Sequence, residues 1–212
     1  MKKIFVVTSN RADYGLMSNL IYLLKKEKTI SLKLIVTGSH LEKKYGYTIN
    51  EILADKINPD HIIKVPLKTI NPIKNIESIT NYMKIFSKFF HKQKPDLLIL
   101  LGDRYEIFSI AVSAFIHKIS IVHLYGGEST LGVFDDFFRY SISKTAKYHL
   151  VSNKLYAKKL ASLSESKNNI FTVGSLGCEN IKMIKFENPT NLEKKFKFKF
   201  LNKNILVSFH PE

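Results

Sequence analysis

The sequence is poor in the residue types that mark secreted, metal-binding and membrane proteins. It has one cysteine, Cys178, so no disulfide can form within the chain, and one thiolate does not make a zinc site. The seven histidines are scattered without an H-x-x-x-H spacing. No apolar run approaches the roughly 20 residues of a membrane-spanning helix, and the run after Met1 is too short for a signal peptide. We therefore expect a cytoplasmic protein without a metal site or a membrane partner.

Motifs that bind nucleotides or activate a serine are also missing. The sequence has no G-x-x-x-x-G-K-[ST] loop and no G-x-S-x-G turn. The first apolar run leads into "SNRADYG" instead of the G-x-G-x-x-G of a dinucleotide-binding turn. Without those glycines the backbone cannot approach a pyrophosphate closely, which argues against a simple NAD site.

Arginine is rare although basic charge is abundant. The formal net charge is +15, but only three of the 33 basic residues are arginines, and the lysines are spread along the chain. No nucleic-acid-binding motif accompanies them, so we interpret the charge as a solvated surface and expect no nucleic-acid partner, with a basic nucleic-acid binder as the weakest alternative. Arg11, Arg104 and Arg139 each lie within four residues of acidic side chains. Because arginine offers a planar fork of donors that lysine lacks, this placement suggests bidentate recognition, and chance with ordinary ion pairing stays open as the alternative.

Apolar runs alternate with segments of helical periodicity and predict a mostly parallel sheet. Strands are expected at residues 3–9, 31–38, 61–67, 95–103, 119–127, 147–153 and 169–175. Helices are expected at residues 14–28, 46–55, 73–93, 105–118, 135–146 and 154–163. Strands separated by helices form right-handed βαβ units. The pattern therefore predicts an α/β fold with a Rossmann-like, doubly wound parallel sheet, whose ligand site lies at the carboxyl ends of the strands.

Two finer predictions concern a helix face and the last residues of the sequence. In the helix expected at residues 73–93, the apolar spacing predicts one buried face made of Ile76, Ile79, Met83, Phe86 and Phe90. The run "NILVSF" at residues 204–209 predicts a further buried strand, with His210 directly after it.

Acidic side chains follow two of the central strands and open one helix. Asp103 ends the fourth strand, and Glu128 lies in "GGEST" after the fifth. Asp136 is the second residue of the segment "DDFFR", at the start of the helix expected at residues 135–146. Three carboxylates on neighbouring loops favour proton transfer. A structural interpretation stays open for Asp103, which has the spacing of a capping box with Glu106, and for Asp136, which can pair with the arginine at i+3. Glu128 could also be a solvent-facing glutamate of a loop.

Two further candidates lie after the first and second strands. Arg11 could hold a phosphate at the N-terminus of the first helix. His40 in "TGSHL" could donate to a ligand, or it could be a structural histidine with both nitrogens satisfied inside the fold.

Seven motifs together resemble one enzyme family. "NRADYG", "VTGSHL", "LGDRYEIF", "GGEST", "DDFFRYSISK", "VGSLGCENI" and "FHPE" have the order and spacing found in the hydrolysing UDP-N-acetylglucosamine 2-epimerases of bacterial sialic acid biosynthesis. The resemblance implies two Rossmann-like domains of the glycosyltransferase-B type. It places the N-terminal domain at residues 1–178, and an interdomain segment with the first strand of a truncated second domain at residues 179–212.

The resemblance also implies an activity and its site. Such enzymes convert UDP-N-acetylglucosamine and water to N-acetylmannosamine and UDP, by elimination of UDP and hydration of a glycal, without a cofactor. It implies a UDP-sugar as ligand and a homo-oligomer for the full-length protein. The residues that match catalytic positions are Asp103, Glu128, Asp136 and His210, with the acid and base roles of the carboxylates not divided. The residues that match substrate-binding positions are Arg11, His40, Arg104 and Arg139.

Two departures from the family pattern matter. The helix motif has Arg139-Tyr140 where the family usually has Arg-His, so a titrating imidazole is replaced by a phenol. The chain also lacks most of a second domain, so we expect little or no epimerase activity from this polypeptide alone, because remote binding energy normally drives the reaction. The alternatives are an epimerase for UDP-2,4-diacetamido sugars on the way to legionaminic acid, and a non-catalytic remnant or binding module.

Overall fold

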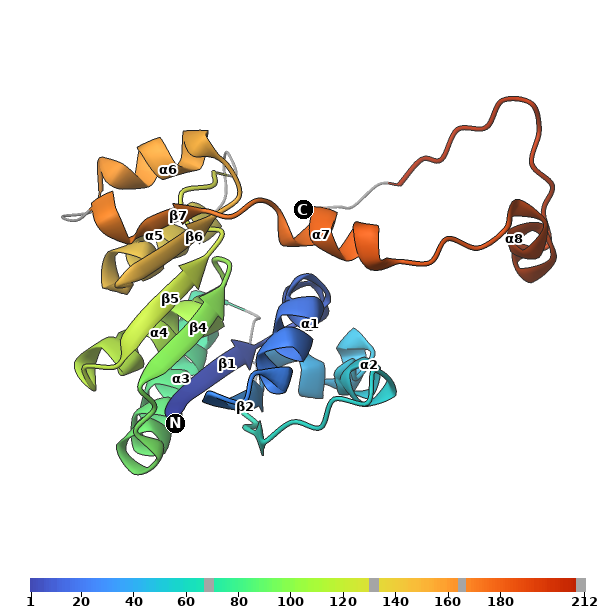
Figure 1. Ribbon diagram of the computed structural model, residues 1–212. Coiled ribbons are helices and arrows are strands. Elements are labelled where there is room, and N and C mark those ends of the chain that lie inside the picture. The colour runs from blue at the N-terminus through green and yellow to red at the C-terminus, as the bar shows by residue number, and fades with distance from the viewer. Residues whose placement is uncertain (67–70, 130–133, 164–166, 209–212) are drawn as a thin grey trace.

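The computed structural model describes residues 1–66, 71–129, 134–163 and 167–208 (Figure 1). Seven parallel strands form one sheet in the order β3-β2-β1-β4-β5-β6-β7, which confirms the predicted doubly wound α/β fold. The strands are β1 Lys2–Thr8, β2 Ile30–Val36, β3 His61–Ile62, β4 Leu97–Leu101, β5 Ser120–Leu124, β6 Tyr148–Val151 and β7 Ile170–Thr172. The helices are α1 Arg11–Lys26, α2 Ile49–Ala54, α3 Pro72–Gln93, α4 Tyr105–Ile116, α5 Asp135–Thr145, α6 Lys154–Ala161, α7 Leu176–Met183 and α8 Pro189–Phe196.

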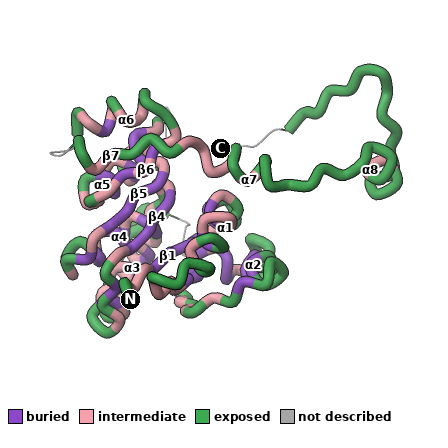
Figure 2. Tube along the Cα trace, in the orientation of Figure 1, coloured by how far each residue is buried: buried purple, intermediate pink, exposed green. Residues whose placement is uncertain are grey.

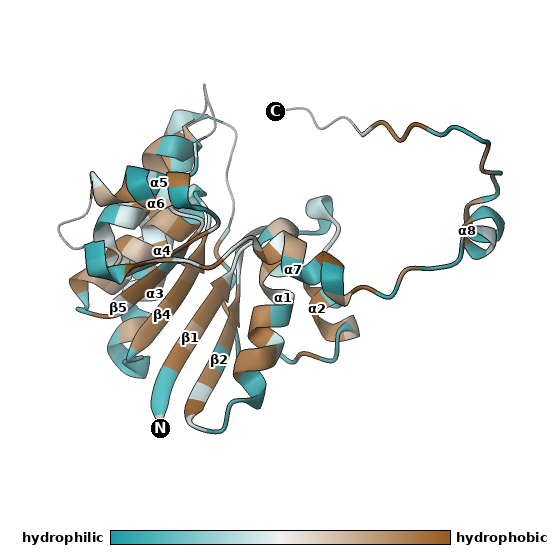
Figure 3. Ribbon diagram, turned by 45° about the horizontal axis from the view of Figure 1, so that its top comes forward, coloured by the Kyte–Doolittle hydropathy of each residue, from teal (hydrophilic) through white to brown (hydrophobic). Residues whose placement is uncertain are grey.

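The central strands are apolar on both faces because helices cover both sides of the sheet, and Figure 3 shows them as a continuous hydrophobic layer. Along β1, Phe5 and Val7 point into a core shared with α3 and α4. Val6 between them points to the opposite face, into a core shared with α1 and α2. This two-sided burial fixes the register of the strands and therefore the positions of the loops that follow them.

The strand order reverses between β1 and β4. The chain leaves β1 toward β2 on one side and later returns to β4 on the other side. In an open parallel sheet this switch leaves a crevice at the carboxyl ends of the two strands, where ligands bind. The loops after β1 and β4 flank that crevice, and β5 lies next to β4.

The buried face of α3 differs in part from the predicted one. Phe86 and Phe90 are buried as predicted, but Ile76 is 62% exposed. The remaining buried positions are Ser78 and Tyr82, so the face follows an i, i+4 ridge. A prediction that counts only apolar residues misses this ridge, because serine and tyrosine each carry a polar atom.

The C-terminal segment extends away from the sheet, and Figure 2 shows it exposed over most of its length. The predicted strand is not formed in residues 204–208, where Ile205, Leu206 and Val207 are 90%, 96% and 81% exposed. A strand needs neighbours for its backbone hydrogen bonds, and no described strand lies beside this run. His210 lies outside the described residues. Among the helices in the described ranges, none combines the length and apolarity that a bilayer crossing requires.

Candidate active site

A buried arginine joins two of the predicted acids. β4 ends at Leu101, and Gly102 turns the chain with a φ of 88°, so that Asp103 leaves the sheet at the crevice. Arg139, one turn into α5, has a side chain that is only 7% exposed. Its guanidinium donates to Asp103 Oδ2, and its Nη1 donates to Asp136 Oδ1 at 2.5 Å. The two carboxylates are therefore held at one cation.

Glu128 lies on the loop that contacts Asp136, because the next residue, Ser129, bonds to that carboxylate. Ser129 Oγ donates to Asp136 Oδ2 at 2.7 Å, and Ser152 Oγ donates to Glu128 Oε1 at 3.0 Å. The structure thus joins two of the predicted carboxylates, Asp103 and Asp136, at Arg139, and it places the third, Glu128, on the adjoining loop with Ser152 as its partner. The three carboxylates come from the ends of β4 and β5 and from the start of α5.

His123 supports this arrangement from below, and it is a residue that sequence reasoning missed. Its Nε2 lies 2.8 Å from the carbonyl oxygen of Gly102, and its Nδ1 lies 2.9 Å from Ser143 Oγ on α5. Because a carbonyl only accepts, Nε2 carries the hydrogen and Nδ1 accepts from the serine. Burial lowers the pKa of His123 to about 4, so the ring is neutral at pH 7. The signal was a lone histidine inside the apolar run of β5.

Gly126, in the loop that follows β5, allows close packing beneath the carboxylates. A Cβ atom on Gly126 would lie 2.8 Å from Ser143 Oγ and 3.0 Å from His123 Nδ1. Only glycine therefore lets the segment before Glu128 approach α5 so closely.

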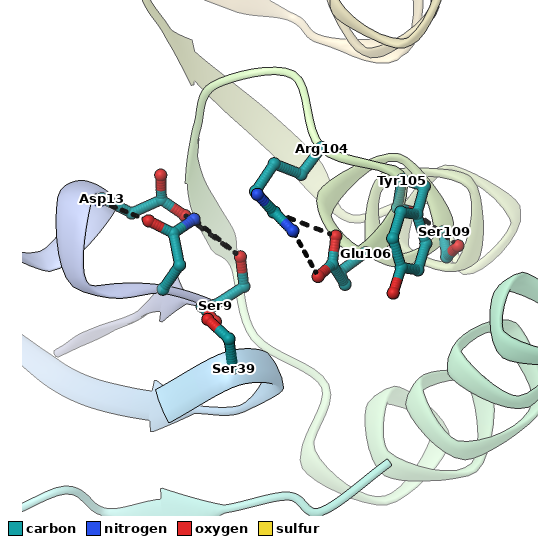
Figure 4. A network of polar contacts seen from close by, with 8 residues as sticks. Ser9, Asp13, Ser39, Arg104, Tyr105, Glu106 and Ser109 are labelled. Atoms are coloured by element: carbon teal, nitrogen blue, oxygen red, sulfur yellow. Dashed lines mark hydrogen bonds and ion pairs between the residues drawn. The ribbon is translucent and has the colours of Figure 1, made fainter. Parts of the chain in front are cut away.

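A second polar cluster lies across the crevice, at the ends of β1 and β4 (Figure 4). Glu106 is fully buried and accepts from Arg104 Nε at 3.3 Å and Nη2 at 3.4 Å. The capping box between Asp103 and Glu106 is not formed, because Arg104 is the N-cap residue of α4 and makes no side-chain cap bond. Asp103 is drawn instead to Arg139.

Asp13 belongs to this second cluster and was not predicted as a site residue. Its Oδ2 accepts from Ser9 Oγ at 3.1 Å and from Asn10 Nδ2 at 2.7 Å. Asn10 also caps α1, because its Oδ1 accepts from the Asp13 backbone N–H at 3.0 Å. Burial raises the pKa of Asp13 to about 6, against the opposing effect of these hydrogen bonds.

The two remaining predicted residues lie outside these clusters. Arg11 is exposed at the start of α1 and pairs with Glu51 of α2, with Nε 3.1 Å from Oε1. His40 is fully buried, with Nε2 2.9 Å from Thr8 Oγ1 and Nδ1 2.8 Å from Thr48 Oγ1. Both ring nitrogens are satisfied inside the fold, and burial lowers the pKa of His40 to about 4. This geometry favours the structural interpretation of His40 over a substrate contact.

Tyr140, which departs from the family pattern, faces away from the acids toward α6. The Lys159 ammonium lies 5.1 Å from the centroid of its ring. This contact gives the tyrosine a packing role on the outer side of α5.

The described site has the parts for acid–base chemistry on a bound anion. Three half-buried carboxylates from separate segments can remove and return protons, and Arg104 offers a cation near the switch point. Within the described ranges, no group of three or more His, Cys, Asp or Glu residues has the arrangement of a metal site.

Sequence comparisons find one matching family and relatives that cover almost the whole of this chain. The family model described as UDP-N-acetylglucosamine 2-epimerase matches residues 23–212. Polysialic acid biosynthesis protein P7 of Escherichia coli is 39% identical over 100% of this chain and 54% of its own length. The GDP/UDP-N,N'-diacetylbacillosamine 2-epimerase (hydrolyzing) of Campylobacter jejuni is 38% identical over 99% of this chain and 54% of its own length. The chain therefore spans about half the length of these relatives.

Solved structures of UDP-N-acetylglucosamine 2-epimerases have the same fold. A UDP-N-acetylglucosamine 2-epimerase crystal structure superposes with a TM-score of 0.78 at 20% identity, over 91% of this chain and 54% of that one. The Neisseria meningitidis UDP-GlcNAc 2-epimerase bound to UDP-GlcNAc gives 0.75 at 20% identity, over 93% and 51%. At this identity the likeness shows the fold, here as about half of a longer chain.

Proposed function

Because this chain belongs to the UDP-N-acetylglucosamine 2-epimerase family, we propose that it forms the acid–base half of a hydrolysing UDP-sugar 2-epimerase. The observation that carries the proposal is the link from Arg139 to both Asp103 and Asp136, with Glu128 on the adjoining loop. A structural ion pair would need one carboxylate. Two carboxylates on one buried cation keep negative charge available at the crevice.

The first proposed step is elimination. A carboxylate takes the proton from C2 of the sugar, the C1–O bond to the diphosphate breaks, and its electrons leave with UDP. The electron pair of the C2–H bond forms the C1=C2 double bond of a glycal. The guanidinium of Arg104 lies where it can stabilise the departing diphosphate, because charge-assisted hydrogen bonds strengthen as negative charge develops.

The second proposed step is hydration. A carboxylate takes a proton from water as the oxygen bonds to C1, and another carboxyl returns a proton to C2 from the opposite face. The product is N-acetylmannosamine when the substrate is UDP-N-acetylglucosamine. Asp103, Glu128 and Asp136 supply the acid and base groups for both steps, and they come from three elements that can face different sides of a sugar ring.

A second substrate has equal support from the relatives. The Escherichia coli relative is named for polysialic acid biosynthesis and the Campylobacter jejuni relative for diacetylbacillosamine, and their identities to this chain are 39% and 38%. We therefore propose a UDP-2-acetamido sugar as the substrate class, with the 4-acetamido form as the second candidate. Parallel assays with UDP-N-acetylglucosamine and the UDP-2,4-diacetamido sugar separate the two.

The proposed nucleotide-binding part of the site lies beyond the described residues, as does His210. We therefore expect the chain alone to release UDP at a small fraction of the rate of a full-length relative. Mixing it with the C-terminal half of such a relative tests the proposal, because activity should return in the mixture. Asp103→Asn in the same mixture should abolish it. A mixture with no activity, although both halves are folded and associate, would contradict the proposed reaction.

A further inference from the structure

The described wall of the crevice holds more acidic than basic side chains. Arg139 is paired with two carboxylates, and Arg104 is paired with the buried Glu106. Glu128 and Asp13 add two more acids at the same end of the sheet. A diphosphate that enters this wall adds further negative charge to partly buried carboxylates. Since like charges in a poorly solvated site are costly, a proton taken up on binding would offset that cost.

Asp13 is the acid whose position suits this role. Its side chain is buried, and Ser9 and Asn10 both donate to Oδ2. The other oxygen, Oδ1, faces the turn after β4, where a Cβ on Gly102 would lie 3.8 Å away. Figure 4 shows the Arg104 guanidinium between Asp13 and Glu106. Asp13 therefore lies in the electrostatic field of Arg104, the cation proposed above to stabilise the diphosphate.

We propose that Asp13 is a proton-exchanging member of the anion subsite at Arg104, and that it takes up a proton from solvent when the diphosphate of a UDP-sugar binds there. The inference rests on the proposed function for the identity of the anion. Asp13 acts on binding through Arg104, as a positioning residue, and it does not touch the reacting carbons.

The direction of the effect follows from the charges around Asp13. Burial raises its pKa to about 6, and the positive charge of Arg104 opposes that rise while Glu106 adds to it. A phosphate bound to Arg104 neutralises the opposing charge, so the pKa of Asp13 rises further in the complex. On the side of the loop after β2, His40 has a pKa lowered to about 4 and stays neutral in this range. Arg11 is engaged by Glu51 on the outer side of α1.

Calorimetric titration of the chain with UDP-N-acetylglucosamine between pH 5.5 and 8 tests the inference. Both phosphates of this ligand are diesters without a second ionisation, so proton uptake reports on the protein. Repeating each titration in two buffers of different ionisation enthalpy gives the number of protons taken up. We expect uptake of up to one proton near pH 6 to 7, and an affinity that falls by up to about tenfold per pH unit above pH 6.

Asp13→Asn should abolish the proton uptake and give an affinity that does not change with pH in this range. Asp55→Asn is the matched control. Asp55 lies at the end of α2 and accepts from Tyr14 of α1, the helix that also carries Asp13, but it lies away from Arg104. Binding without proton uptake, or uptake that persists in Asp13→Asn, overturns the inference and leaves the proposed function intact.

A measurement without ligand separates the two proposals. The Asp13 pKa is read from its carboxyl carbon by NMR in the wild-type chain and in Arg104→Gln, and the variant should show a higher pKa. An unchanged pKa overturns the inference whatever binds. No binding at any pH overturns the proposed anion subsite at Arg104, and the expected pKa rise would then show only that Asp13 and Arg104 are coupled.

Discussion

Arg139 and Asp103 form a buried ion pair, although 36 positions of the sequence separate them. Arg139 also pairs with Asp136 one turn earlier in α5. Removing the cation would leave two carboxylates close together and poorly solvated. We predict that Arg139→Gln lowers the free energy of unfolding by about 2–4 kcal/mol, because removal of the cation leaves the buried negative charges of Asp103 and Asp136 uncompensated.

Urea unfolding at pH 7 measures this loss. Arg139→Lys should recover part of it, since a lysine restores the charge but lacks the planar fork that reaches both carboxylates. Lys182→Gln is the exposed control, because its pair with Glu179 lies on the surface, and it should leave the free energy of unfolding unchanged within the error of the measurement. Equal stability of Arg139→Gln and the wild-type chain would show that the cation is not needed there.

The loop that carries Glu128 depends on a glycine. Gly127 has a φ of 79°, and a Cβ atom there would lie 2.8 Å from the carbonyl oxygen of Tyr156. We predict that Gly127→Ala destabilises the chain by about 1–3 kcal/mol, from backbone strain and from the displacement of α6. Gly15→Ala, in an open position within α1, should instead stabilise it by about 0.5–1 kcal/mol. Thermal unfolding of the two variants side by side distinguishes these opposite shifts.

The strand ends were the most predictable part of the site. Buried apolar runs that end in glycine and a carboxylate placed Asp103 and Glu128 correctly at one edge of the sheet, because strand order and direction follow from the βαβ pattern. The partner of Asp103 was not predictable. The contact of Asp103 with Arg139 depends on how α5 packs beside β4, which local spacing does not encode.

Local rules also gave one wrong partner and missed one buried acid. The spacing of Asp103 and Glu106 fits a capping box, but the distant Arg139 attracts the first acid and the adjacent Arg104 attracts the second. Asp13 was hidden for the opposite reason, since a carboxylate three residues after Asn10 is typical of a helix start. Its burial arises only when β4 returns to lie beside β1.

The stability of the chain should fall as the pH is lowered from 6 to 4. His40 and His123 have folded pKa values of about 4, below the value near 6.5 expected when they are unfolded, so the unfolded state binds two more protons in this range. Asp13 acts in the opposite direction, because its folded pKa of about 6 lies above its usual value and the folded state holds one more proton. Burial also lowers the pKa of His149, which adds to the protons that the unfolded state binds. The net difference of at least about one proton predicts a loss of roughly 1.4 kcal/mol or more per pH unit.

Urea unfolding at pH 6, 5 and 4.5 checks this slope. His123→Gln should flatten it, because it removes one of the protons that favour the unfolded state. Asp13→Asn should make it steeper. A free energy of unfolding that stays constant or rises toward pH 4.5 would contradict the neutral, buried state of the histidines.

The exposed C-terminal segment should contribute little to the stability of the sheet. Phe186 and Ile205 are exposed, whereas α7 is fixed to α1 because Asn180 Nδ2 donates to the carbonyl oxygen of Gly15 at 2.6 Å. We predict that a chain ending at residue 185 unfolds within about 1 kcal/mol of the 212-residue chain. Limited proteolysis should cut first between residues 186 and 208. A large drop in the midpoint of thermal unfolding would show that this segment packs on the sheet.

Tyr125 connects the Glu128 loop to the start of α7. It has a φ of 62°, and its hydroxyl oxygen accepts from the Leu176 N–H at 2.8 Å, where the N-cap residue Ser175 makes no side-chain cap bond. Tyr125→Phe removes only this oxygen and leaves the ring in place. Loss of one such bond costs about 1–1.5 kcal/mol, so the Leu176 amide should exchange with solvent roughly tenfold faster.

Hydrogen exchange of the Leu176 amide, followed by NMR, measures this change. Tyr148→Phe on β6 is the matched control, because that ring packs on the same face of the sheet and, among the described residues, no hydrogen bond joins its hydroxyl to α7. Since α7 leads out of the sheet domain, a tyrosine that fixes both its first turn and the loop before Glu128 ties the orientation of the C-terminal segment to the acids. Unchanged exchange at Leu176 in Tyr125→Phe would show that α7 is held by its contacts with α1 instead.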